Sequence, residues 1–105
     1  MKMLFVPVDE QGIDDCEYMR YDSDHVESFE LTDEEYDEMW AEGVIYRINK
    51  ACGTLIDDYE EDRIENGQLV NAITVLNNEK KWDQSQLSKA IRRAIEVGTF
   101  VDTSF

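Results

Sequence analysis

Two short segments of the chain place tyrosine among carboxylates, a combination suited to holding a basic protein surface. Carboxylates accept paired hydrogen bonds from arginine, and tyrosine adds rigid contact area with a polar tip. In the run 57–62, Tyr59 interrupts five acids, and Tyr18 stands in a second acidic segment. A core anchor is an equally good interpretation of Tyr59. The predicted partner-binding residues are Asp57, Asp58, Tyr59, Glu60, Glu61, Asp62, Asp14, Asp15, Glu17 and Tyr18.

Residue types that could support catalysis are scarce. The single histidine, His25, stands in a polar segment without a nucleophile motif, and a solvated side chain is the simpler interpretation. Cys16 lies between Asp15 and Glu17, whose charges oppose formation of a thiolate. Cys52 falls on an apolar stripe, which is typical of a core position. We therefore predict that the protein is not an enzyme and uses no cofactor.

The acidic run 57–62 could also be examined as a calcium loop. An EF-hand needs oxygen ligands at its third and fifth positions and glycine at its sixth. Tyr59 and Glu61 occupy the third and fifth positions here, and the sixth is Asp62 rather than glycine. We predict no specific metal site. A divalent-metal-binding protein or a carboxylate enzyme remains a third alternative, which a calcium-dependent rise in melting temperature would favour.

The charge of the chain is strongly negative and unevenly distributed. The formal net charge is −15, and between Asp9 and Glu42 fifteen acids are accompanied by Arg20 as the only arginine or lysine. The C-terminal third is nearly neutral, which indicates one polarised face, although a merely solvated surface is the simpler alternative. Phosphates and anionic lipids would be repelled, so we expect neither nucleic acid nor membranes as partners. A basic protein is the expected partner.

The 105 residues, 42% of them hydrophobic, predict one folded domain spanning residues 1–105. Two cysteines without C-x-x-C spacing and the lack of an export signal or membrane span predict a cytoplasmic protein. The segment 1–8 has the pattern of a strand, with Pro7 placing it at a sheet edge or ending it. Gln11-Gly12 indicates a turn, 16–21 a second strand and 22–27 a loop.

Helix signals dominate the rest of the chain. Thr32 and Glu35 form a capping box at the start of one helix, and Gly43 and Gly53 bracket a second over 44–52. The apolar spacing from 69 to 77 predicts a third. The fourth is expected to begin at a cap on Asp83, with Trp82 packing on Leu87, and to stop at Gly98 before a short strand or tail at 99–105. The predicted fold class is α+β, with about four helices packed on a small N-terminal β-sheet.

A pattern of short motifs spans about residues 29–76 and consists of 31–36 (LTDEEY), Trp40, Gly43-Val44, Ile48-Asn49 and 55–61 (LIDDYEE). In these motifs the chain resembles small acidic immunity proteins of bacterial polymorphic-toxin and contact-dependent growth inhibition systems. The resemblance implies a cytoplasmic inhibitor that neutralises a cognate toxin, often a nuclease with a basic cleft, by covering the active site or a neighbouring exosite. Opposite potentials would speed such an encounter.

An acidic DNA mimic is the alternative to the immunity protein. Such a protein, of the phage anti-restriction or anti-CRISPR type, blocks a nucleic-acid-binding protein and shares the acidic surface. It differs in not serving a single cognate toxin. Carboxylates spaced like duplex phosphates, and binding to several unrelated DNA-binding proteins, would favour this alternative.

Overall fold

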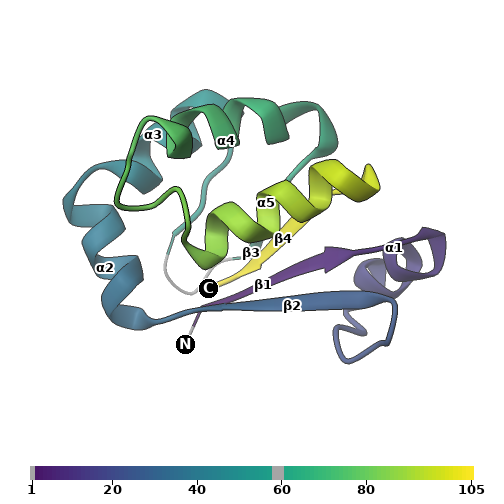
Figure 1. Ribbon diagram of the computed structural model, residues 1–105. Helices are drawn as coiled ribbons and strands as arrows, with labels where there is room; N and C mark the ends of the chain where they lie inside the picture. Colours follow the sequence, from purple (N-terminus) through teal and green to yellow (C-terminus); the bar gives the residue numbers. More distant parts are fainter. Residues whose placement is uncertain (1, 58–60) are drawn as a thin grey trace.

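The computed structural model describes residues 2–57 and 61–105, in which a four-stranded antiparallel sheet is flanked by helices on both faces (Figure 1). The strand order is β2-β1-β4-β3, so β2 and β3 form the two edges. The strands are β1 (Lys2–Pro7), β2 (Val26–Leu31), β3 (Glu61–Ile64) and β4 (Val101–Ser104). The α+β class is therefore confirmed. The sheet is not only N-terminal, because its β3 and β4 come from the second half of the chain.

Five α-helices accompany the sheet in the described residues, one more than predicted. They are α1 (Glu10–Glu17), α2 (Asp33–Ala41), α3 (Val44–Cys52), α4 (Leu69–Asn77) and α5 (Gln86–Val97), with a 3-10 turn, η1 (Asn66–Gln68), before α4. α5 packs on β1 and β2, α4 packs on both α5 and α3, and α1 packs on β1 and β2 from the other side. None of the helices described is long and apolar enough to cross a bilayer.

Local capping chemistry sets the limits of α2 and α3 as predicted. The Thr32 hydroxyl accepts from the Glu35 amide, and the Glu35 carboxylate accepts from the Thr32 amide, which completes the capping box. Gly43 and Gly53 both adopt left-handed φ values, 76° and 68°, which glycine reaches without steric cost. The helix between them therefore begins and ends where the sequence predicts.

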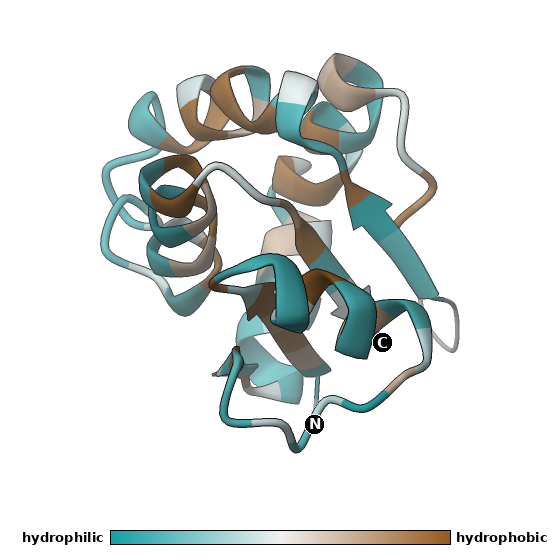
Figure 2. Cartoon of the chain, turned by 90° about the vertical axis from the view of Figure 1, so that its right-hand side faces the viewer, coloured by the Kyte–Doolittle hydropathy of each residue, from teal (hydrophilic) through white to brown (hydrophobic). Residues whose placement is uncertain are grey.

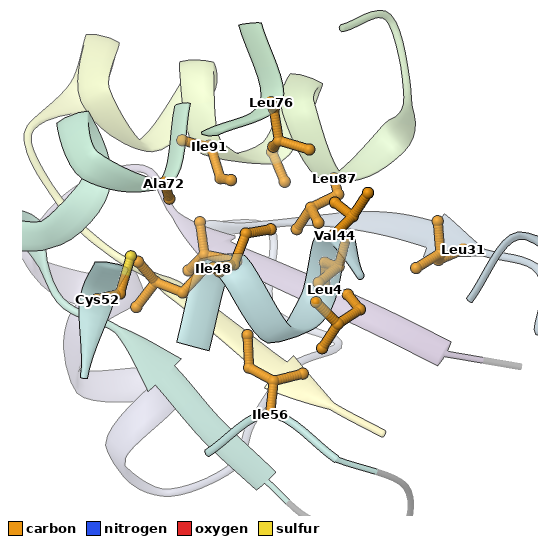
Figure 3. Packing of buried hydrophobic residues seen from close by; sticks show 14 of the residues in the cluster. Leu4, Leu31, Val44, Ile48, Cys52, Ile56, Ala72, Leu76, Leu87 and Ile91 are labelled. Carbon is orange, nitrogen blue, oxygen red and sulfur yellow. The ribbon is translucent and has the colours of Figure 1, made fainter. Parts of the chain in front are cut away.

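The sheet separates two hydrophobic clusters. The larger one lies between α2, α3, α4 and α5 and the face of the sheet opposite α1. Its centre includes Leu4, Ile48 and Ile91 (Figure 3). The smaller one lies under α1 and contains Phe5, Cys16, Val26 and Phe100. The alternation of side chains along a strand explains this division, because Leu4 and Phe5 point to opposite faces of β1. Hydrophilic residues follow the outer surfaces of most elements (Figure 2).

The segment 9–21 differs most from its prediction. Instead of a turn and a strand it forms α1, because the Asp9 side chain caps the helix by accepting from the Gly12 amide at 2.8 Å. Pro7 ends β1, which is an inner strand of the sheet, and it lies beyond the residues of β1 that pair with β4. The predicted loop at 22–27 includes the start of β2.

The cap of α5 was also placed wrongly by the sequence pattern. Ser85, two residues after Asp83, is the N-cap, and its hydroxyl accepts from the Ser88 amide. The buried Ser88 hydroxyl in turn donates to the Trp82 carbonyl at 2.6 Å. These local bonds make the helix begin two residues later than a cap on Asp83 would allow. Gly98, with φ 73°, ends the helix as predicted.

Candidate protein-binding surface

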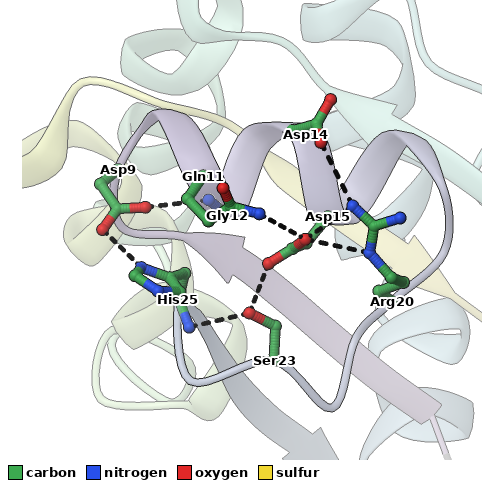
Figure 4. A network of polar contacts seen from close by, with 8 residues as sticks. All are labelled: Asp9, Gln11, Gly12, Asp14, Asp15, Arg20, Ser23 and His25. Atoms are coloured by element: carbon green, nitrogen blue, oxygen red, sulfur yellow. Dashed lines mark hydrogen bonds and ion pairs between the residues drawn. The ribbon is translucent and has the colours of Figure 1, made fainter.

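The position of α1 is fixed by contacts with the start of β2. Asp9 contacts both elements, because one carboxylate oxygen accepts from the Gly12 amide and the other lies 2.8 Å from Nδ1 of His25 (Figure 4). The His25 carbonyl accepts from the Val8 amide at 3.0 Å. Gly12 packs so closely on that carbonyl that a Cβ at this position would lie 2.1 Å from its oxygen. Helix α1 thus sits on the sheet as tightly as the backbone permits.

Asp15 is the centre of a second group of contacts beside α1. Its buried carboxylate accepts from Gln11 at 2.9 Å, from the Arg20 guanidinium at 2.9 and 3.0 Å, and from the Ser23 hydroxyl at 2.5 Å (Figure 4). The Ser23 bond is the largest cause that lowers the pKa of Asp15. These contacts hold the connection between α1 and β2. Because its oxygens are already used, Asp15 is removed from the surface offered to a partner.

An ion pair joins the two segments that the sequence singles out. Arg63 on β3 donates to Glu17 at the end of α1 at 2.7 Å and to Asp102 on β4 at 2.5 and 3.2 Å. The guanidinium also covers the ring of Phe100, with 3.7 Å to its centroid. Asp102 is buried and additionally accepts from the Tyr21 hydroxyl at 3.3 Å. Arg63 therefore places the end of α1 against β3.

A groove of about 380 Å³ lies between α1 and β3 around this ion pair. Burial, and to a smaller extent the charge of Asp102, raises the pKa of Cys16 to about 12. The charges of Asp15 and Glu17 also raise this pKa. Burial likewise raises the pKa of Tyr21. Both shifts favour the neutral thiol and the neutral phenol at neutral pH. The groove is lined by Cys16, Glu17, Met19, Tyr21, Glu61, Asp62, Arg63, Glu65, Asp102 and Thr103.

The remaining predicted residues take different positions. Glu17, Asp57 and Glu61 are exposed, as is Asp14, which pairs with Arg20 at 3.2 Å. Tyr18 is 67% exposed under the Arg20 guanidinium. The Asp62 carboxylate is turned inward and accepts from the Leu55 and Arg63 amides at 2.5 and 2.7 Å. Three predicted residues lie outside the described residues: Asp58, Tyr59 and Glu60.

A further set of carboxylates was not selected from the sequence. It begins in the connection before the edge strand β2, includes one residue of that strand and continues onto α2, along the outer margin of the molecule (Figure 1). Within residues 2–57 and 61–105 these side chains form no ion pair, unlike Glu27 in the same strand, which accepts from Arg93. We call this set the acidic band, and it consists of the exposed residues Asp22, Asp24, Glu30, Glu34 and Asp37. The high acid content of 9–42 pointed to the segment, but only the structure shows which acids lack a cation.

The His25–Asp9 pair gives α1 a pH-dependent attachment. The hydrogen bond that the His25 ring donates to Asp9 is the main cause that raises the pKa of His25 above 6.5, and the same bond lowers the pKa of Asp9 below 3.8. The charges of Asp15 and Asp24 raise the pKa of His25 further. The pair therefore stabilises the fold fully between about pH 3.8 and pH 6.5, and this contribution is lost as pH rises through the folded-state pKa of His25. In acid it is lost as pH falls through the lowered pKa of Asp9.

We expect a proton NMR titration of the single imidazole to give a pKa above 6.5 for the protein and a lower value, closer to 6.5, for Asp9→Asn. Asparagine keeps the capping oxygen but removes the charge that favours the imidazolium. Equal His25 pKa values in the two proteins would contradict this assignment of the hydrogen bond.

Comparison with solved structures gives one clear similarity. The chain shares the fold of the Neisseria DNA mimic protein DMP12. The superposition covers both chains completely, with a TM-score of 0.66 and 14% sequence identity. This similarity concerns the fold, because the identity is low. No protein-family model matches the chain, and no curated protein sequence matches it.

Proposed function

We propose that the chain binds a nucleic-acid-binding protein by presenting carboxylates where that protein would otherwise hold phosphates. The observation that carries this proposal is the acidic band, five exposed carboxylates without an ion pair in the described residues. The name of the structural neighbour, a DNA mimic protein, supports it. The net charge of −15 supports it as well, since a partner with a basic cleft would be attracted from a distance.

The spacing of charge on α2 is similar to that of a DNA strand. Exposed acids at 33, 34, 37, 38 and 42 follow one another along this helix and its C-cap. At about 1.5 Å rise per residue, they place one carboxylate per roughly 3 Å. DNA carries one charge per about 3.4 Å of each strand. Lys81 bonds two of the acids, Glu38 and Glu42, so the N-terminal half of α2 has the stronger field.

Protection of an open sheet edge does not account for all of these charges. Charged side chains on an edge strand discourage pairing with other chains, and Glu30 on β2 fits that role. Glu34 and Asp37, however, lie on a helix, whose backbone bonds are already internal. Their exposure beside Glu30 therefore favours a binding surface that extends beyond the edge strand.

A competition experiment tests the proposal. Several basic DNA-binding proteins of unrelated fold are each loaded with a short fluorescein-labelled duplex, and release of the duplex by the chain is followed by anisotropy. The variant Glu30→Gln/Glu34→Gln/Asp37→Asn should need about tenfold more protein for half release of the duplex. Each substitution removes one exposed ion pair with the DNA-binding protein, and each such pair contributes about 0.5 kcal/mol to binding. The matched control Glu65→Gln/Asp83→Asn/Glu96→Gln removes the same charge elsewhere and should stay within about twofold. Equal potency of the two triple variants would refute the acidic band.

A second candidate function, that of an immunity protein for one basic toxin, is favoured by a different observation. Tyr18 and Met19 are 67% and 55% exposed next to Glu17, at the rim of the groove between α1 and β3. An aromatic and a methionine beside carboxylates suit one dedicated partner. A protein with this function would release no duplex from the DNA-binding panel and would retain a single basic protein from its native lysate at moderate salt.

A further inference from the structure

A second groove, of about 340 Å³, lies at the other end of the molecule, between α2 and the connection from α3 to β3. It is lined by Trp40, Asn49, Leu55, Ile56 and Asp57. Leu55 is 75% exposed, the largest exposed fraction among the bulky apolar side chains described, and Trp40 is half-buried. An indole that packs partly on the core and an exposed isobutyl group therefore line the same groove.

The backbone that carries Leu55 is held firmly by one side chain. The Asn49 amide pairs with Ile56 in both directions, donating to its carbonyl at 3.0 Å and accepting from its N–H at 2.8 Å. The Thr54 hydroxyl donates to the same Asn49 oxygen at 2.8 Å, and the Leu55 amide donates to Asp62. Thr54 and Ile56 are thereby turned inward, and Leu55 is turned outward. A preorganised apolar group loses little entropy when a partner covers it.

Acidic side chains accompany this apolar groove. Asp57 lines it and is exposed. Asp37 of the acidic band precedes Trp40 by three residues on α2, so the two side chains are neighbours on the helix surface. An apolar groove with an acidic rim complements an apolar side chain that has lysine or arginine beside it. Charge complementarity thus selects the same kind of partner as the acidic band.

We propose that the groove between Trp40 and Leu55 takes an apolar side chain from the basic, nucleic-acid-binding partner. This inference rests on the proposed function and adds a contact that DNA cannot supply. Binding through phosphates weakens steeply as salt rises, because it depends on release of counterions. Burial of apolar surface does not depend on counterions and keeps its strength. The groove would let the chain displace DNA from its partner even at moderate salt.

Two fluorescein-labelled peptides test this inference by anisotropy. One alternates lysine and glycine, and the other has the same lysines but a central leucine in place of one glycine. We expect the protein to bind the leucine peptide about tenfold more tightly, at low and moderate salt alike. The variant Leu55→Ser should lose this advantage. Val70→Ser, which alters an apolar side chain that is 64% exposed on α4, should keep it.

Equal affinity of the protein for both peptides, or a leucine advantage that survives in Leu55→Ser, would overturn the apolar site. The proposed function has a separate readout in the same experiment. The lysine-glycine peptide should bind more weakly to Glu30→Gln/Glu34→Gln/Asp37→Asn, and unchanged binding there would count against the acidic band instead. Leu55 and Val70 are both exposed, so a matching thermal transition for the two serine variants verifies that neither change disturbs the fold.

Discussion

Replacing Arg63 by methionine is expected to destabilise the protein by about 3 kcal/mol, because it leaves a carboxylate buried without its cation. The Asp102 side chain is only 8% exposed, and without Arg63 its remaining partner is the Tyr21 hydroxyl. Methionine preserves apolar contact with Phe100 but not the charge over its ring. The guanidinium is 25% exposed, so the loss should fall at the lower end of what buried pairs show.

Urea unfolding followed by circular dichroism measures this effect, and the melting temperature should fall by roughly 10–20 °C. Lys81→Met is the matched control, because Lys81 also bonds two carboxylates, Glu38 and Glu42, but is 57% exposed. Its loss should cost less than about 1 kcal/mol. The double variant Arg63→Met/Asp102→Asn should regain part of the stability. Arg63→Met and Lys81→Met of equal stability would show that the Arg63 pair is worth no more than a surface pair.

Substituting Gly12 by alanine should also destabilise the protein, by about 2–3 kcal/mol, although alanine is the better helix former. The added Cβ would lie 2.1 Å from the His25 carbonyl oxygen and 3.1 Å from Cβ of Pro7, so α1 has to move off the sheet. Neither neighbour can easily yield, because the His25 carbonyl accepts from the Val8 amide and proline is rigid.

The sign of the change distinguishes this contact from helix propensity. Without the contact, alanine in α1 would stabilise the protein by up to about 1 kcal/mol. Gly67→Ala is the control, since nothing lies within 4 Å of a Cβ there, and it should be neutral or slightly stabilising. Unfolding free energies from urea titration, together with amide exchange in α1, provide the measurement. A Gly12→Ala protein as stable as the parent would mean that α1 packs less closely than described.

Sequence was a good guide wherever structure is set by near neighbours in the chain. The capping box at Thr32 and the glycines at 43, 53 and 98 fix helix ends through bonds within a few residues, so α2, α3 and the end of α5 were predictable. Gly12 is different, because glycine after glutamine has the pattern of a turn. Glycine is needed at this position because the backbone of His25 leaves no room for a Cβ. This contact joins two segments, and no local sequence pattern contains it.

The candidate site was predictable in composition but not in arrangement. Of the residues selected in the two acidic segments, Glu17 and Glu61 line one groove, whereas Asp15 is buried. Arg63, which joins the two segments, was not selected, because its role depends on β3 pairing with β4. The acidic band was missed for a related reason. Fifteen acids look alike in the sequence, and only the folded chain shows which of them a cation neutralises.

The pairing of β1 with β4 has a consequence for the order of folding. These strands lie side by side in the middle of the sheet, with Leu4 opposite Thr103, although nearly the whole chain separates them. Helices such as α2 and α3 can form from local contacts, whereas the sheet cannot close until residues 101–104 have been synthesised. On the ribosome, β1 and β2 can therefore pair early as an antiparallel pair with α1 between them in the chain. β3, whose only strand neighbour in the described sheet is β4, must wait for the last strand.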